Sequence, residues 1–173
     1  MLPDRVIRNG RVENESWTFV GLEPEATIQS LPEGRIAVPL ALWKAQRGIL
    51  KARGALVGVW LKPDDEPGEL AEDVSHLAFI AVHFPKFTDG RGYSTASLLR
   101  RRHGYKGELR AFGDVGRDQL FYLKRVGFDS FALAPHRDPE AALASFGDFS
   151  VRYQGSIDDP VPLFRKRTAG AAA

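Results

Sequence analysis

Short apolar runs alternate with amphipathic segments along most of the chain from residue 35 onward. This alternation predicts five βα units. The predicted strands are 36–38, 56–61, 77–84, 109–112 and 128–133, and the helices that follow them are 40–52, 68–74, 94–102, 115–126 and 139–146. Residues 77–82 are apolar at every position, which is typical of a strand covered on both faces by helices. The pattern predicts an α/β fold with a mainly parallel sheet, either open or closed as a partial barrel.

Turn residues predict where several of these elements begin and end. Asn9-Gly10 lies between two runs of strand formers, and this dipeptide favours a β-hairpin because both residues tolerate positive φ. Asp138-Pro139 supplies an N-cap and a first-turn proline to the last helix. We expect one domain over residues 1–167, with the hairpin and a connector at 1–34, and a flexible tail at 168–173.

Composition limits the kinds of protein that this chain can be. It has 173 residues, of which 43% are hydrophobic and 27% charged, as in an ordinary folded domain. No apolar run is long enough to cross a bilayer, and the first residues lack the apolar core of a secretory signal, so we expect a cytoplasmic protein with no membrane partner. The absence of Cys excludes disulfides and thiol redox chemistry. Electron transfer would therefore need an organic cofactor or a partner.

Charge is unevenly distributed along the sequence. The net charge of +2 argues against nucleic acid as a partner. Residues 63–75 contain six acidic and no basic side chains, whereas residues 86–110 contain seven basic and two acidic ones, a net charge of +5. We therefore expect an acidic and a basic face, which suits a protein partner or an anionic ligand.

Polar residues follow the predicted strands, and ligands of parallel α/β sheets bind outside the carboxyl ends of the strands. Cations next to the first amides of a helix favour a small oxyanion, a phosphate or a carboxylate. An ordinary turn between strand and helix is the alternative interpretation. Besides Lys62 and His136, the candidate anion-binding or ligand-binding residues are Lys86, Asp89, Gly90, Arg91, Gly92, Ser94, Asp114 and Arg117.

The sequence contains no established catalytic motif. Gly90 and Gly92 match the first two glycines of the dinucleotide fingerprint, but Thr95 replaces the third. The four His residues lack the short spacing of zinc ligands, so we expect no metal site. Asp114 and Asp118 are candidates for a carboxylate pair, but Asp114 as a helix cap and Asp118 paired with neighbouring side chains is the commoner arrangement. These residues leave open whether the protein is an enzyme.

Several longer stretches resemble a bacterial family of unknown function. They are Phe84-Pro85-Lys86-Phe87-Thr88-Asp89-Gly90-Arg91-Gly92-Tyr93-Ser94, Leu98-Leu99-Arg100, Gly104-Tyr105-Lys106-Gly107-Glu108-Leu109-Arg110-Ala111, Gly113-Asp114-Val115, Arg117-Asp118-Gln119-Leu120-Phe121-Tyr122-Leu123, Gly127-Phe128-Asp129 and Pro162-Leu163-Phe164-Arg165. The resemblance extends from Pro39 to Arg167. This chain departs from the family at two positions, with His83 where members often have Asp and Val126 where they often have Cys.

The resemblance implies a role in sulfur metabolism. Members are commonly described as probable oxidoreductases involved in sulfite reduction, and their genes lie beside the gene for the haemoprotein subunit of sulfite reductase. The role it implies is that of an accessory protein of assimilatory sulfite reduction, with that subunit as partner. The alternative is an oxidoreductase with a bound flavin or nicotinamide at the ends of the strands, held by Lys86, Arg91 and Asp114.

Overall fold

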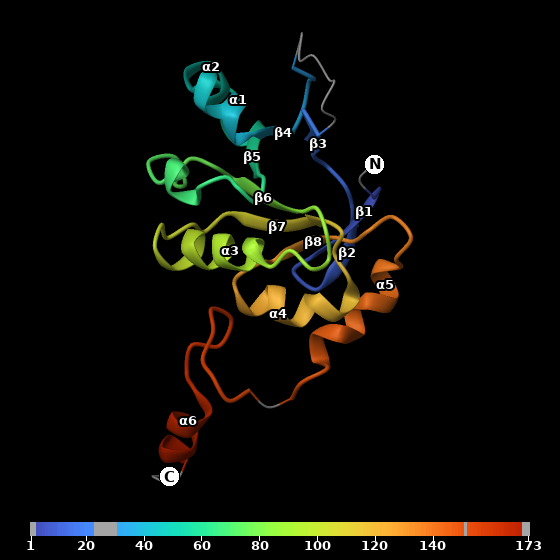
Figure 1. Cartoon of the computed structure of the whole chain (residues 1–173), viewed down its shortest axis with the longest axis vertical. Helices are drawn as coiled ribbons and strands as arrows, with labels where there is room; N and C mark the ends of the chain where they lie inside the picture. Colours follow the sequence, from blue (N-terminus) through green and yellow to red (C-terminus); the bar gives the residue numbers. More distant parts are fainter. Residues whose placement is uncertain (1–2, 23–30, 151, 171–173) are drawn as a thin grey trace.

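Eight strands form one sheet in the order β2-β1-β8-β7-β6-β5-β4-β3 in a computed structural model, which describes residues 3–22, 31–150 and 152–170 (Figure 1). Parallel pairs join the strands from β3 to β8, whereas β1 is antiparallel to both β2 and β8. The strands are β1 (Arg5–Arg8), β2 (Arg11–Asn14), β3 (Thr18–Phe19), β4 (Ile36–Pro39), β5 (Val57–Leu61), β6 (Phe79–Phe84), β7 (Glu108–Gly113) and β8 (Ser130–Ala132).

The helices are mostly short. The α-helices are α1 (Leu40–Ala45), α2 (Arg47–Ala52), α3 (Arg91–Arg101), α4 (Leu120–Arg125), α5 (Pro139–Ala142) and α6 (Leu163–Gly170). Helices α1 to α4 lie between successive strands, whereas α5 and α6 follow β8. The 3₁₀ turns are η1 (Gly54–Leu56), η2 (Pro67–Leu70), η3 (Arg117–Gln119) and η4 (Leu143–Gly147). Asp138 caps α5 as predicted, because its side chain accepts a hydrogen bond from the amide of Glu140 at 3.0 Å.

The predicted hairpin is confirmed, but the expected mainly parallel sheet of five βα units is corrected to a mixed sheet. Asn9 and Gly10 have φ of 49° and 77°, as the tight turn between β1 and β2 requires. The hairpin then adds antiparallel to β8. The second predicted helix, at 68–74, is observed only as the 3₁₀ turn η2, because the segment is too short to form a stable α-helix by itself, although Glu69, Leu70 and Ala71 are good helix formers.

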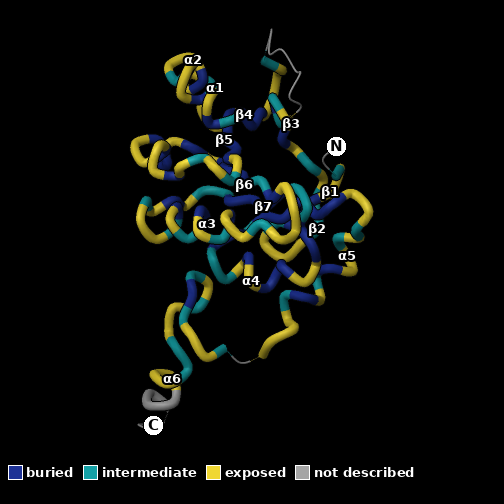
Figure 2. The backbone as a smooth tube through the Cα atoms, viewed as in Figure 1, coloured by how far each residue is buried: buried dark blue, intermediate teal, exposed yellow. Residues whose placement is uncertain are grey.

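Helices cover only one face of the sheet. The larger apolar cluster contains most of the buried apolar side chains of the helices, with Phe121 of α4 as an exception, together with alternate strand residues such as Ile80 and Val82. The smaller cluster consists of residues on the opposite side of the strands, including Trp60, Phe79 and Phe112, and it contains no helix residue. Figure 2 shows the strands as the most buried part of the chain. Continuous apolarity in β6 therefore reflects an inner face that the curled sheet buries by itself, and helices on both sides are not needed.

The two edges of the sheet are joined by a very short connection. β2 is one edge strand and β3 the other, yet only Glu15, Ser16 and Trp17 separate them in the sequence. Four residue steps span at most about 14 Å, so the sheet must curl until its edges approach each other. The result is an open, half-barrel sheet. We call residues 15–17 the edge link and the concave side of the sheet its inner face.

The edge link fills one end of the inner face. The Trp17 ring stacks on the Phe79 ring with centroids 4.3 Å apart, and the carboxylate of Glu15 pairs with the guanidinium of Arg110. Arg110 is 1% exposed and also donates a hydrogen bond to the hydroxyl of Ser130 at 2.8 Å. The amino ends of β6 and β7 are thus closed over the inner face, which leaves their carboxyl ends as the accessible mouth.

Two predicted segments lie partly outside the described residues. They are the connector before β4, of which residues 23–30 are not described, and the tail, of which residues 171–173 are not described. The C-terminal segment reaches away from the sheet and carries α6, which continues to Gly170, beyond the predicted domain end at residue 167 (Figure 1). Among the described helices, none has the length and apolarity to span a bilayer.

Candidate binding site at the carboxyl ends of the strands

Two loops at the carboxyl ends of neighbouring strands are joined by hydrogen bonds. The loop after β6 contains Phe87, whose amide donates to a side-chain oxygen of Asp114 in the loop after β7 at 2.9 Å. The side chain of Gln119 donates to the carbonyl of Phe87 at 3.2 Å and accepts from the amide of Gly116 at 2.9 Å. We call residues 62–66, 85–91 and 114–119, which follow β5, β6 and β7, the rim. The hydrogen bonds of Phe87, Asp114 and Gln119 hold residues 85–91 and 114–119 of the rim together at one edge of the sheet.

Arg91 is held by two carboxylates of the rim. Its guanidinium pairs with Asp89 at 2.6 Å and also with Asp64 in the loop after β5. The amide of Arg91 adds a third donor to Asp89 at 3.1 Å. These hydrogen bonds from Arg91 lower the pKa of Asp89 to about 2 and raise the pKa of Arg91 itself. The charge of Arg91, one of the residues that we expected to bind an anion, is thus already neutralised by two carboxylates.

The other predicted site residues fall into three groups. Lys86, Ser94 and Arg117 are exposed, and within the described part of the chain no carboxylate pairs with either cation. Asp114 accepts the amide of Phe87, so it joins the two loops and does not cap α4 as we had considered. Gly90 and Gly92 belong to the start of α3 and are treated next. The sequence therefore predicts that these loops lie at one edge of the sheet, but it does not predict which of their charged side chains form ion pairs.

The two glycines have different roles, and neither one forms a dinucleotide cradle. A Cβ added at Gly92 would lie 2.4 Å from the ring of Phe84, so this glycine permits α3 to pack closely on β6. A Cβ at Gly90 would meet nothing within 4 Å. Because Gly92 faces a ring, Arg91 is paired and Asp114 binds a backbone amide, the residues at this edge do not fit the phosphate turn of a nicotinamide or flavin dinucleotide.

His83 lies at the mouth of the inner face, among aromatic rings. Its imidazole stacks on the ring of Phe112 with centroids 4.9 Å apart, and the ring of Trp60 meets it edge-on at 6.4 Å. Lys62 lies over the ring of Trp60, with its Nζ 5.9 Å from the centroid. Burial lowers the pKa of His83; the charge of Asp89 acts against this shift, and the charge of Lys62 adds to it. His83 is therefore a neutral, half-buried imidazole beside the rim at neutral pH.

The basic face predicted for residues 86–110 is smaller than the sequence suggests. Arg110 is buried, and Arg91 is paired. Arg100 donates to the carbonyls of Tyr105, Gly107 and Gly127 and pairs with Asp129 at 2.7 Å. The acidic stretch is likewise engaged, since Asp73 is fully buried between cations and Glu69 pairs with Lys44. The exposed cations that remain between residues 86 and 110 are Lys86, Arg101, Arg102 and Lys106.

Sequence reasoning missed the inner face as a second buried layer with the half-buried His83 at its open end. The alternation of Phe79, Ala81 and His83 with Ile80 and Val82 in β6 was visible, but an all-apolar run hides which alternate set faces the helices. Among the described side chains, no three His, Asp or Glu are placed to hold a metal ion.

Comparison with known proteins gives one family. The family model described as a bacterial protein of unknown function (DUF934) matches residues 58–164, from β5 to the start of α6, and so includes the whole rim. Neither a search of curated proteins nor one of solved structures gives a match to the chain. The family match confirms the resemblance to a bacterial family of unknown function.

Proposed function

Because this chain belongs to DUF934, a bacterial family of unknown function, we propose a role for it: it acts as an accessory protein of assimilatory sulfite reduction in the cytoplasm, with the haemoprotein subunit of sulfite reductase as its partner. The resemblance described above is the source of the pathway and of the partner. The proposed physical contribution of the chain is to hold a small oxyanion at the rim.

One observation carries the anion-binding part of this proposal. Lys86 and Arg117 are exposed cations on the two rim loops that hydrogen bonds join, and within the described residues neither has a carboxylate partner. Arg91 must remain with Asp64 and Asp89, since an oxyanion would have to displace two carboxylates from it. Lys86 and Arg117, and not Arg91, are therefore the principal anion contacts, with Lys62 as a third cation of the rim.

Thermal stability of the purified chain tests the anion site directly. Ligands that bind the native state raise the melting temperature, so sulfite, and to a smaller extent sulfate and phosphate, should stabilise the parent protein. The double variant Lys86→Ala/Arg117→Ala should lose the response. Arg101→Ala/Arg102→Ala removes the same charge from the far end of α3 and should keep it. The absence of any anion-dependent shift in the parent protein would eliminate the rim site.

The partnership needs its own experiment. Purified chain and purified haemoprotein subunit should form a complex that co-elutes in gel filtration, and deletion of the gene should slow growth on sulfate but not on cysteine. The accessory role fails if the two proteins elute separately at micromolar concentrations and the deletion strain uses sulfite normally.

An oxidoreductase with a bound cofactor is the second candidate. The half-buried imidazole of His83 at the carboxyl end of β6 favours it, because a neutral imidazole beside the rim can accept or donate a proton during a reaction. Purified protein with the visible absorbance of a flavin, or a melting temperature raised by a nicotinamide nucleotide, would support this candidate over the accessory role.

A further inference from the structure

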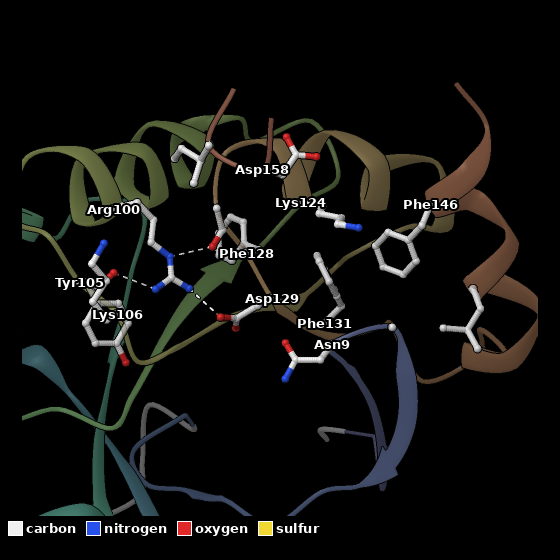
Figure 3. A pocket seen from close by; sticks show the side chains of 14 residues that line it. Asn9, Arg100, Tyr105, Lys106, Lys124, Phe128, Asp129, Phe131, Phe146 and Asp158 are labelled. Atoms are coloured by element: carbon white, nitrogen blue, oxygen red, sulfur yellow. Dashed lines mark hydrogen bonds and ion pairs between the residues drawn. The ribbon is translucent and has the colours of Figure 1, made fainter. Parts of the chain in front are cut away.

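A second site lies at the opposite end of the sheet from the rim. A cavity of about 670 Å³ opens at the amino ends of β7 and β8, and none of the predicted site residues lines it (Figure 3). Its walls come from the hairpin turn, the segment between α3 and β7, α4, the start of β8, η4 and residues 157–158. Its volume is typical of cavities that bind small organic molecules.

The body of the cavity is aromatic and apolar. The rings of Phe128, Phe131 and Phe146 line it, with the last two 5.2 Å apart between centroids. Ile157 from the C-terminal segment completes a wall, and its amide is hydrogen-bonded to the carbonyl of Arg125 in α4 at 3.0 Å. A flat apolar group would bury one face against these rings.

The side chains that line the cavity carry more unpaired positive charge than negative charge. Both carboxylates in its lining are paired, Asp129 with Arg100 at 2.7 Å and Asp158 with Arg152 at 2.8 Å. Burial also raises the pKa of Asp129. Lys106 and Lys124, in contrast, are exposed and have no carboxylate partner within the described residues, and the Nζ of Lys124 lies 5.6 Å from the centroid of the Phe146 ring. Two cations therefore remain for a ligand to neutralise.

We propose that this cavity binds a small organic anion with a flat apolar body, such as an aromatic carboxylate or sulfonate. The ring system packs against Phe128, Phe131 and Phe146, and the anionic group meets Lys124 beside the Phe146 ring, while Lys106 on the other side of the pocket adds to its positive potential (Figure 3). This site is independent of the proposed oxyanion site, which lies at the other end of the strands and has no aromatic enclosure of this kind.

Naphthalene-2-sulfonate is a suitable probe, with the neutral 2-naphthol as its uncharged counterpart. We expect the sulfonate to bind the full chain and to shift the backbone amide resonances of Gly10 and Gly127, two glycines of the lining. The double variant Lys106→Glu/Lys124→Glu should bind the sulfonate at least tenfold more weakly, since each exposed charge contact contributes up to about fivefold. Its affinity for 2-naphthol should change by less than about twofold.

A matched control separates this site from the rim. Lys86→Glu/Arg117→Glu makes the same change in charge at the other end of the sheet, so it should bind the sulfonate like the parent protein while losing the sulfite response. In the parent protein, a response to the sulfonate without a response to sulfite would refute the oxyanion site alone, and the reverse would refute the present inference alone. Melting temperatures within a few degrees of the parent protein verify that each variant is folded.

Three results would overturn the inference. One is no binding of the sulfonate at millimolar concentration, and another is resonance shifts that map to a different surface. The third is equal affinity for sulfonate and naphthol in the parent protein, together with unchanged affinity in the Lys106→Glu/Lys124→Glu variant, which would leave an apolar cavity with no selectivity for anions.

Discussion

Arg110 in β7 pairs with Glu15 of the edge link, and this buried contact ties the middle of the sheet to the connection between its two edges. Arg110 also pairs with Glu108 at 2.6 Å, and its guanidinium lies 4.7 Å from the centroid of the Phe79 ring. The inner face is thus closed at one end by a charge whose carboxylate partners come from the distant edge link and from β7 itself.

Loss of Arg110 should strongly destabilise the fold. Arg110→Met keeps much of the apolar volume but leaves Glu15 and Glu108 without their buried cation, so the free energy of unfolding should fall by about 3–5 kcal/mol. Urea denaturation measures this change. Adding Glu15→Gln should recover part of the loss, because one uncompensated charge is then gone. A double variant that is less stable than Arg110→Met would contradict this explanation.

Asp73 should make stability sensitive to acid. Burial alone would raise the pKa of this carboxyl, but donors from Lys51, Trp43 and Arg47 outweigh burial and hold its pKa below the usual 3.8. The unfolded chain therefore binds the proton more readily, and the contribution of Asp73 to stability is complete above about pH 4 and is lost as the pH falls through the lower folded value. Urea denaturation at several pH values should show this loss.

The matching variant is Asp73→Asn. It should lower the free energy of unfolding by about 3 kcal/mol at pH 7, because Arg47 and Lys51 lose a buried counter-charge. It should also lose less stability than the parent protein between pH 4 and pH 2. Parallel acid profiles of the two proteins would show that other carboxyls are responsible.

Gly92 and Gly90 form a matched pair for testing the packing of α3. Gly92→Ala places a Cβ 2.4 Å from the Phe84 ring, which is buried and cannot move freely, so a loss of about 1–3 kcal/mol is expected. Gly90→Ala meets nothing within 4 Å, so its effect should stay within about 0.5 kcal/mol. Thermal denaturation compares the two. A larger loss at Gly90 would point to a role for that glycine that packing does not provide.

The pKa of His83 should respond in opposite directions to its two charged neighbours. Lys62→Ala removes a cation that lowers the pKa of His83 and should raise it, whereas Asp89→Asn removes an anion that raises this pKa and should lower it further. The imidazole resonances in an NMR titration report both shifts. Identical His83 titration in all three proteins would mean that neither charge lies close enough to matter.

The lowered pKa of His83 also has a consequence for stability. The unfolded chain takes up the proton near pH 6.5, before the folded one does, so the stability due to neutral His83 decreases as the pH falls below about 6.5 and stops decreasing below the folded pKa. His83→Phe should flatten the unfolding free energy over this range. Unchanged pH dependence would assign the slope to another group.

Features fixed by neighbouring residues could be predicted from the sequence. The hairpin follows from Asn9-Gly10, and the start of α5 follows from Asp138-Pro139. The loops of the rim were also located correctly, because they follow apolar strands. The mixed character of the sheet was not predicted, since the pairing of Ile7 with Phe131 depends on residues far apart in the chain.

Charge pairing was the least predictable part of the candidate site. Asp64 lies 27 residues before Arg91, so the sequence alone does not show that this arginine meets a second carboxylate. Arg110 was counted among the cations of a basic face, although it is almost fully buried. Arginine usually lies at the surface, and only the curl of the sheet and the position of Glu15 explain its burial.

The pairing of β1 with β8 sets the order in which the protein can be completed during synthesis. Residues 5–8 are synthesised long before their second sheet neighbour at residues 130–132. The hairpin therefore cannot pair with β8 until that strand has been synthesised, and Glu15 cannot form its ion pair with Arg110 until β7 is in place. Such long-range closure slows folding, so a nascent chain that stops before residue 130 should expose the inner face to chaperones and proteases.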